Sequence, residues 1–276
     1  TEVQEKEAKM EFKVSALCKG CGACVRDCGF GVLAMKDGRP VVREGREEQC
    51  MNCQHCLAVC PEGAVTINGV DADACTPLAQ MPIPPPNELA NLLRSRRSIR
   101  QFVKADIPRG EIAELLETLK YVPTGCNVRH LTFRVVEGSA KMAQLRQAMM
   151  EMLAAHLEEL PESLRKIVVG WQKHPEVDVF FRGAPHVLVV FGDPKAVTPQ
   201  VDCDAACAYF DLLAQANGIG TTWFGFLTHI VGAVPEVSGL FGIPRGAPFH
   251  AMLFGEPAVD YARCVNRSNG AKIEWA

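Results

Sequence analysis

The chain of 276 residues lacks any apolar run close to the roughly 20 residues that a membrane-spanning helix needs. Its net charge is only −3, so its overall charge favours neither nucleic acid nor an anionic membrane surface. The segment 1–13 alternates acidic and basic residues and lacks the apolar core of a secretory signal. We therefore expect a cytoplasmic protein that binds neither nucleic acid nor membranes.

Several catalytic motifs are missing as well. The sequence has no Gly-rich phosphate loop followed by lysine, which argues against ATP chemistry. Its seven histidines are dispersed, without a His-x-x-x-His pair or a mixed cluster of cysteine and histidine. The hydrophobic share of 48% and the charged share of 22% are those of an ordinary soluble globular protein.

Cysteine, in contrast, is abundant and unevenly placed, with eight of the 13 cysteines between positions 18 and 60. These eight form two runs of the pattern C-x-x-C-x-x-C-x-x-x-C, and an offset of 32 residues maps the first run onto the second. The members are Cys18, Cys21, Cys24 and Cys28 in the first run, and Cys50, Cys53, Cys56 and Cys60 in the second. A disulfide scaffold needs a secreted context, which nothing here supplies, so ligation of metal or cluster is the better interpretation.

The spacing of each run is typical of bacterial two-cluster ferredoxins, in which the fourth cysteine of a run ligates the other 4Fe–4S cluster. This rule assigns Cys18, Cys21, Cys24 and Cys60 to one cluster, and Cys50, Cys53, Cys56 and Cys28 to the other. Cys60 precedes a proline, as in the ferredoxin pattern, whereas Cys28 precedes Gly29. Two tetrahedral zinc sites are the alternative, but zinc-binding cysteines usually come as two pairs far apart.

A proline-rich segment at 76–87 separates two regions of different character. Four prolines, at positions 82, 84, 85 and 86, forbid helix there and favour a stiff polyproline extension. We predict a two-cluster ferredoxin-like domain at 1–75, a linker at 76–87 and a second domain at 88–276. A bland spacer between unrelated modules is the alternative.

The second domain alternates amphipathic segments with short β-branched runs, which predicts a mixed α+β fold. Helices are expected at 88–95, 111–121, 139–160, 162–173 and 202–217, and strands at 131–137, 186–192, 219–225 and 249–255. In the first domain, Asp37-Gly38 predicts a tight turn between strands at 32–36 and 39–42.

Three segments of the second domain carry groups suited to a cofactor. Arg96-Arg97-Ser98-Ile99-Arg100 offers guanidinium forks and a hydroxyl for a phosphate, although a short basic run is also typical of a solvated face or a nucleic-acid patch. The loop Pro123-Thr124-Gly125-Cys126-Asn127 can present backbone and amide donors, or be an ordinary turn. The stretch 217–225 lacks G-x-G-x-x-G and follows a helix, so it is not a dinucleotide fingerprint.

In this order, the three segments resemble the nitroreductase family of FMN enzymes. The family's R-R-S-x-R is present as Arg96, Arg97, Ser98 and Arg100. Its P-S-x-x-N-x-Q loop corresponds to Pro123, Thr124, Asn127 and Arg129, with arginine in place of the usual glutamine. Its G-L-G-x-x-W-x-G segment corresponds to residues 218–225, and the resemblance covers essentially all of residues 88–276.

The resemblance implies a nitroreductase-like three-layer α+β domain with a mainly antiparallel central sheet, and FMN bound at the interface of a homodimer. By position, it implies phosphate contacts from Arg96, Ser98 and Arg267, with Arg263 as a helper, and a ribityl contact from Arg97. It places Arg100 near the pyrimidine edge of the ring, where positive charge stabilises the reduced flavin. The other residues implied around the ring are Thr124, Asn127, Arg129, Trp223, Phe224 and Gly225.

A cluster module joined to a flavin module implies an electron route between one-electron clusters and a two-electron cofactor. We expect an FMN-dependent oxidoreductase of an anaerobe that reduces a small electrophile such as a nitroaromatic, a quinone or an activated alkene. The sequence leaves open whether NAD(P)H reduces the flavin directly or a ferredoxin- or flavodoxin-type donor acts through the clusters. The alternative function is an electron-transfer module that serves a protein partner without small-molecule turnover.

Three cysteines of the second domain have weaker cases for chemistry. Cys203 and Cys207 lie four apart on a predicted helix, and we expect two core thiols there rather than a metal pair. Cys126 sits in the predicted ring-contacting loop, where packing is favoured over a redox role.

Overall fold

The computed structural model describes residues 10–267 and 270–275. It divides into two compact units, Thr1–Pro84 and Pro85–Ala276, so the division falls inside the segment 76–87. Residues 1–9, most of the charged segment in which a secretory signal was not expected, lie outside the described residues.

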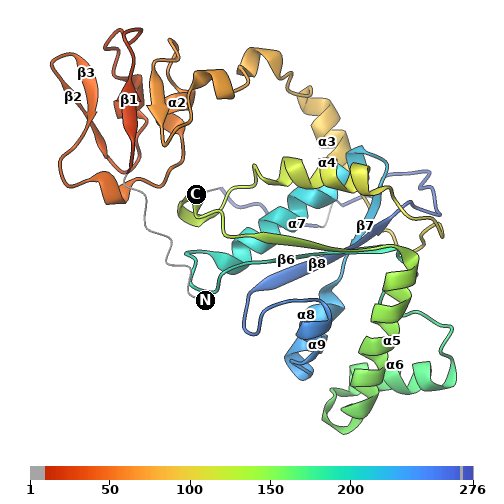
Figure 1. Cartoon of the computed structure of the whole chain (residues 1–276). Helices are drawn as coiled ribbons and strands as arrows, with labels where there is room; N and C mark the ends of the chain where they lie inside the picture. Colours follow the sequence, from red (N-terminus) through yellow and green to blue (C-terminus); the bar gives the residue numbers. More distant parts are fainter. Residues whose placement is uncertain (1–9, 268–269, 276) are drawn as a thin grey trace. The chain divides into compact units, whose positions relative to one another are not determined.

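The N-terminal unit consists of two antiparallel ribbons and two helical turns (Figure 1). The ribbons pair β1 (Phe12–Val14) with β4 (Val65–Ile67), and β2 (Leu33–Lys36) with β3 (Arg39–Val42). Asp37 and Gly38 both have positive φ, 47° and 76°, as a tight turn between β2 and β3 requires.

The repeat of the sequence is also a repeat of backbone conformation. Helices α1 (Ala23–Arg26) and α2 (His55–Ala58) each begin two residues after the second cysteine of a run. The residues before them, Gly22 and Gln54, both adopt the left-handed conformation, with φ of 72° and 60°. Two 3₁₀ turns, η1 (Glu47–Gln49) and η2 (Ala72–Ala74), complete the unit.

The proline-rich segment contains more helix than the sequence predicts. A 3₁₀ turn, η3, occupies Leu78–Gln80, and α3 (Pro86–Ser95) begins at a proline rather than behind Asn87. Proline suits the first position of a helix because it has no N–H to leave unpaired there and its φ is already helical. The prediction that these prolines forbid helix was therefore wrong for Pro86.

The C-terminal unit is built on a sheet with the strand order β5-β6-β8-β7, in which every neighbouring pair is antiparallel. Its strands are β5 (Thr132–Glu137), β6 (His186–Phe191), β7 (Gly220–Trp223) and β8 (Phe249–Gly255). Residues 187–190 of the central strand β6 are completely buried, because helices cover both faces of the sheet. This confirms the predicted α+β fold with a mainly antiparallel sheet.

Two hydrophobic cores lie on opposite faces of this sheet. On one face, α4 (Arg109–Leu119) and α7 (Pro199–Ala216) pack against the strands. On the other lie α5 (Ser139–Ala155), α8 (Gly225–Ala233) and α9 (Val237–Leu240), with α6 (Glu162–Lys173) packed on α5 (Figure 1). Cys203 and Cys207 of α7 are fully buried in the core between this helix and the sheet, as expected of core thiols, and burial raises the pKa of Cys203 to about 12.

Several boundaries differ from the predicted ones. The helix predicted at 202–217 begins at Pro199, and the helix predicted at 139–160 ends at Ala155, before a 3₁₀ turn, η5 (Leu157–Glu159). The strand predicted at 219–225 ends at Trp223, because Gly225 already begins α8. Helices α8 and α9 were not predicted.

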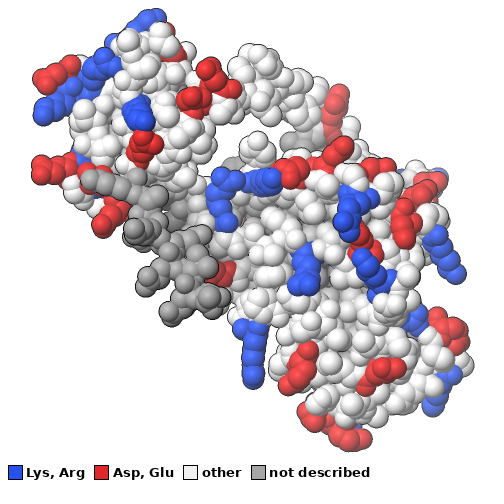
Figure 2. Space-filling model, in the orientation of Figure 1, with Lys and Arg blue, Asp and Glu red and all other residues white. Residues whose placement is uncertain are grey.

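Two surface features bear on partners. None of the described helices is both long and apolar enough to cross a membrane. On the face of the C-terminal unit drawn in Figure 2, Lys and Arg side chains lie interspersed with Asp and Glu. That mixture is the one expected for a chain whose net charge is −3.

Candidate functional site

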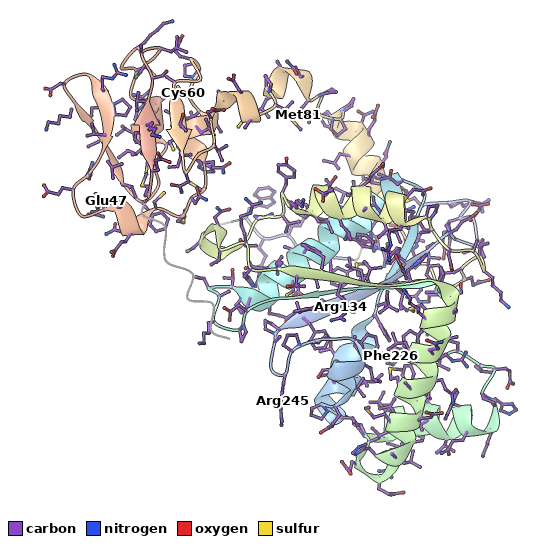
Figure 3. The ribbon with its side chains drawn as sticks, in the orientation of Figure 1. Glu47, Cys60, Met81, Arg134, Phe226 and Arg245 are labelled. Carbon is purple, nitrogen blue, oxygen red and sulfur yellow. The ribbon has the colours of Figure 1, made fainter. Side chains whose placement is uncertain are left out.

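Two pockets of the N-terminal unit are lined by the cysteines of the two runs. Cys18, Cys21, Cys24 and Cys60 line one pocket, and Cys28, Cys50, Cys53 and Cys56 line the other. Each pocket thus takes three cysteines from one run and the fourth from the other run. The fourth cysteines, Cys28 and Cys60 (Figure 3), come just after helices α1 and α2, and each of them lines the pocket of the opposite run. Four thiols around one hollow fit a 4Fe–4S cubane, and the crossed ligand sets stay our prediction.

The surroundings of the thiols suit iron ligation. The N–H groups of Gly20 and Ala64 point at the sulfur atoms of Cys18 and Cys60, at 3.5 and 3.3 Å, where they can stabilise thiolates. Burial raises the pKa of Cys56 to about 11, so forming its thiolate costs free energy, and the positive charge of bound iron would offset that cost. Among the described residues, no group of three or more His, Cys, Asp or Glu side chains is arranged to hold a single metal ion.

In the C-terminal unit, the segment 96–100 lies along β7. Ser98 forms a parallel bridge with Thr221, and the Ile99 N–H donates to the carbonyl of Thr221 at 2.7 Å. This close approach requires glycine at position 220, because a Cβ there would meet Cγ1 of Ile99 at 2.6 Å. The predicted phosphate segment and the start of the stretch 217–225 are therefore side by side.

Buried Asp211 of α7 fixes the first arginine of this segment. Its Oδ2 lies 3.2 Å from Nη1 of Arg96, and its Oδ1 accepts the hydroxyl of Thr221. Arg97 lies over the ring of Tyr261, with 6.0 Å from its Cζ to the ring centroid, whereas Arg100 is exposed. One nitrogen of Arg96 is thus taken, and the other donors of its guanidinium remain for an anion.

Trp223 lies further along the same side of α7. Its ring stands edge-on to His250, at 4.6 Å between centroids, and Nδ1 of His250 lies 2.7 Å from Oδ1 of Asp204. Asp204 and Asp211 are seven residues apart, close to two helical turns, so they share one edge of α7 about 10.5 Å apart. We call the set Arg96, Ser98 and Trp223 along this edge the flavin row.

Phe224 does not have its predicted place. Its side chain is buried in the core against Phe181 and Phe241, and its N–H donates to the carbonyl of Ala251 at 2.9 Å. The ring and the backbone N–H of Phe224 are thus both engaged within the fold, which leaves the predicted contact from Phe224 without support here. Gly225 is exposed at the first position of α8.

The segment 123–130, which contains the predicted ring-contacting loop 123–127 and Arg129, is held by buried Asp202 at the start of α7. The Asp202 carboxylate accepts from the Gly125 N–H at 3.1 Å and from the Thr198 hydroxyl at 2.8 Å. It also lies 2.8 Å from Nε2 of His130, whose Nδ1 accepts from the Asp193 N–H, so Nε2 carries the proton. None of Asp202, His130 and Thr198 was predicted as a functional residue.

The loop needs such support because its backbone is unusual. Cys126, Asn127 and Arg129 have positive φ of 51°, 54° and 52°, a conformation that costs free energy for residues other than glycine. The Arg129 guanidinium donates to the carbonyl of Lys120 at 3.3 Å, which draws it back to the end of α4 and away from its predicted ring contact. Cys126 is exposed, so it does not pack within its own chain as was expected.

The loop and the flavin row lie on opposite edges of α7 within one chain. Asp202 and Asp211 are nine residues apart, which places them half a turn out of phase around the helix. The structure therefore brings Arg96 and Ser98 together with Trp223, but not with Thr124 and Asn127. Arg263 and Arg267 are exposed after β8, and neither forms an ion pair with a described carboxylate.

The Asp202 cluster predicts a specific dependence of stability on pH. Burial alone would raise the pKa of Asp202, but hydrogen bonds from His130, Thr198 and Gly125 outweigh it and lower the pKa below its ordinary value. A lowered folded pKa means that ionised Asp202 stabilises the fold above about pH 4, and that this contribution is lost as the pH falls through the folded pKa. Asp202→Asn should therefore melt well below the wild type at pH 7 and by a smaller margin at pH 3.

Melting curves at the two pH values test this, with Glu114→Gln on the exposed face of α4 as the control. An unchanged margin between wild type and Asp202→Asn at pH 3 and pH 7 would contradict the proposed role of the charge.

Comparison with known proteins assigns both units. Residues 93–256 match the model of the nitroreductase family, and residues 17–65 match that of the 4Fe–4S dicluster domain. Ferredoxin-3 of Nostoc sp. is 31% identical over 70 residues, 20% of this chain and 72% of that protein. The iodotyrosine deiodinase of Thermotoga neapolitana is 25% identical over 137 residues, 48% of this chain and 71% of that protein.

Solved structures share the fold. A nitroreductase with bound FMN from Bacteroides fragilis is 23% identical and covers 68% of this chain and 100% of its own, with a TM-score of 0.54. A second, from Desulfitobacterium hafniense, is 22% identical and covers 68% and 99%, with a TM-score of 0.53. The predicted combination of an iron–sulfur module with a nitroreductase-like module is confirmed.

Proposed function

The chain belongs to the nitroreductase family, and from this premise we propose that it is an FMN oxidoreductase in which two 4Fe–4S clusters exchange electrons with the flavin, which reduces a small electrophile. The observation that carries the proposal is the flavin row along one edge of α7. Its cationic end, Arg96 and Ser98, suits a phosphate, and its aromatic end, Trp223, suits a flat ring. Bound FMN supplies the ability to exchange electrons singly with clusters and in pairs with an acceptor.

A second copy of the chain completes the site in this proposal. The outward face of α7 is apolar, and an exposed apolar patch of this kind marks an interaction surface. The face consists of Val201, Ala205, Ala208, Tyr209, Leu212 and Ala216, of which Val201 is 64% and Tyr209 50% exposed. We propose a homodimer packed on this face, in which the loop 123–130 of one chain meets the flavin row of the other. Thr124 and Asn127 then contact the ring from the partner side.

The remaining contacts follow from exposure. Arg100 is exposed next to the row, half-buried Arg97 lies over Tyr261, and exposed Arg263 and Arg267 can add charge at the phosphate end. Positive charge near the ring stabilises the negative charge that a reduced flavin develops. The acceptors that fit an accessible flavin are nitroaromatics, quinones and activated alkenes, and the similarity to an iodotyrosine deiodinase adds halogenated aromatics.

We propose that electrons enter through the clusters from a ferredoxin- or flavodoxin-type donor. The test is an anaerobic visible spectrum of the purified protein, recorded with NADH or NADPH and then with a reduced ferredoxin. The flavin band should bleach rapidly only with ferredoxin, and a variant that lacks a cluster should lose that bleaching. Equally fast bleaching by NADPH in wild type and variant would make the nicotinamide the donor and the clusters the exit. Absence of a flavin band after reconstitution with FMN would overturn the proposal.

A further inference from the structure

A cavity of about 260 Å³ lies between α5 and α6, outside the flavin row. Apolar side chains from both helices and from the segment after α6 line most of it. They are Met150, Ile167, Trp171, Val177, Val179 and Phe180. An apolar cavity of about 150 Å³ can hold a benzene ring, so this one has room for a single substituted ring.

Two cations stand at the rim of the cavity, and both have donors to spare. Arg146 carries five N–H donors, of which one donates to the carbonyl of Pro175, while its Nε lies 3.9 Å from Oδ1 of Asp178. Lys166 is paired with Glu162 at 2.6 Å, but both side chains are exposed, and such a pair contributes little free energy. An anionic ligand can replace Glu162 as the partner of Lys166.

Asp178 is the one carboxylate among the described residues that line the cavity, and its oxygens already have hydrogen-bond and ion-pair partners. Asp178 accepts from the N–H groups of Phe181 and Gly183, each at 2.9 Å, in addition to its ion pair with Arg146. Its charge is thereby compensated within the loop after α6, and it repels an incoming anion only weakly. His174, the remaining polar group of the lining, pairs with Glu176 at 3.3 Å.

We propose that this cavity binds a small aromatic anion, with its ring against Trp171 and Phe180 and its anionic group at Arg146 and Lys166. An aromatic carboxylate has this combination of a flat apolar body and one negative end. Arginine forks match carboxylates in geometry, and Trp171 offers a flat apolar face for the ring.

Two aromatic rings, those of Phe180 and Phe226, connect the cavity to the chain just after Trp223 of the flavin row. Phe180 packs edge-on against Phe226, at 5.3 Å between centroids and 76° between planes. Phe226 directly follows Gly225 at the start of α8 and is labelled beside α5 and α8 in Figure 3. A role of the occupant as the electron acceptor rests on the proposed function, whereas binding itself does not.

Gly170 allows the cavity to be filled without strain. It lies inside α6, and a Cβ built on it would meet nothing within 4 Å. Gly170→Leu fills the cavity, and Gly170→Ala adds only a methyl group, while both replace a glycine that costs helix stability. Equal or higher melting temperatures of both variants establish that they fold.

Binding of 4-nitrobenzoate to the flavin-loaded full chain, measured by calorimetry, tests the proposal. We expect Gly170→Leu to weaken binding at least about tenfold, a loss near 1.4 kcal/mol, and Gly170→Ala to leave it nearly unchanged. Lys166→Gln should weaken 4-nitrobenzoate but not neutral 4-nitrotoluene. Equal affinity of Gly170→Leu and the wild type, or no saturable binding, would overturn the proposal.

Anaerobic reduction of 4-nitrobenzoate by the same variants identifies the role of the occupant. If turnover by Gly170→Leu falls in proportion to binding, the bound anion is the acceptor. If binding is lost and turnover is unchanged, the cavity is a separate effector site, and binding of the anion still stands. A purified protein that binds no flavin would overturn the proposed function alone, because the cavity between α5 and α6 can bind the anion without flavin.

Discussion

Replacing Leu212 by glutamate is expected to give a monomer that no longer retains FMN. Leu212 lies in the middle of the apolar outward face of α7, so the new carboxylate would enter the proposed interface without a partner. An uncompensated buried charge costs roughly 3–5 kcal/mol, and a two-fold interface meets it twice. Because the flavin row and the loop 123–130 lie on opposite edges of α7, a chain alone keeps only half of the contacts to the flavin.

The measurements are the molar mass in solution and the affinity for FMN, which we expect to fall at least about a hundredfold, near 2.7 kcal/mol. Leu212→Met keeps the face apolar and should behave as the wild type. Ala140→Glu, on the exposed first turn of α5, adds the same charge elsewhere. A monomer that binds FMN as tightly as the dimer would refute the two-chain site, and an intact dimer would refute the interface.

The longer helices and the central strands could be predicted because each has a regular pattern of burial. Residues 187–190 form an unbroken apolar run in which three of the four residues are valine, and this β-branched content favours a covered strand over a helix. Helix α8 escaped prediction because residues 225–233 are apolar on nearly every side, and a short apolar run does not distinguish helix from strand. The sheet ends at Trp223 because Phe224 turns its ring into the core.

The cysteine pockets could be predicted because the ligands of each run are close together in sequence, at a spacing typical of 4Fe–4S ligation. The Asp202 cluster could not, since it joins His130 and Gly125 to a helix more than seventy positions later. An aspartate in the first turn of a helix looks like an ordinary favourable charge. Arg129 has a different reason, because its bond to Lys120, only nine residues away, depends on a left-handed backbone that the residue type does not indicate.

The crossing of the cysteine runs makes a sharper prediction than the presence of clusters. Cys60→Ser should remove the cluster held by the first run, although residue 60 belongs to the second, and Cys28→Ser should do the converse. Each variant should lose about half of its iron, since each cluster has its own four ligands. Cys75→Ser is the control, because Cys75 is exposed and its thiol donates to the carbonyl of Asp71 at 3.4 Å, away from both pockets.

Redox titration followed by electron paramagnetic resonance tells which cluster is lost. The pocket containing Cys60 is also lined by Lys19 and Glu62, whereas Phe30 and Met51, together with the polar Gln49, Gln54 and His55, line the pocket containing Cys28. Because the surroundings of a cluster set its potential, the two clusters should give two distinguishable signals. Cys60→Ser should then lose the same signal as Cys21→Ser, and Cys28→Ser should lose the other one. Loss of the same signal by Cys28→Ser and Cys21→Ser would mean that each run holds its own cluster, and loss of both signals in any of these variants would mean that the two clusters do not form independently.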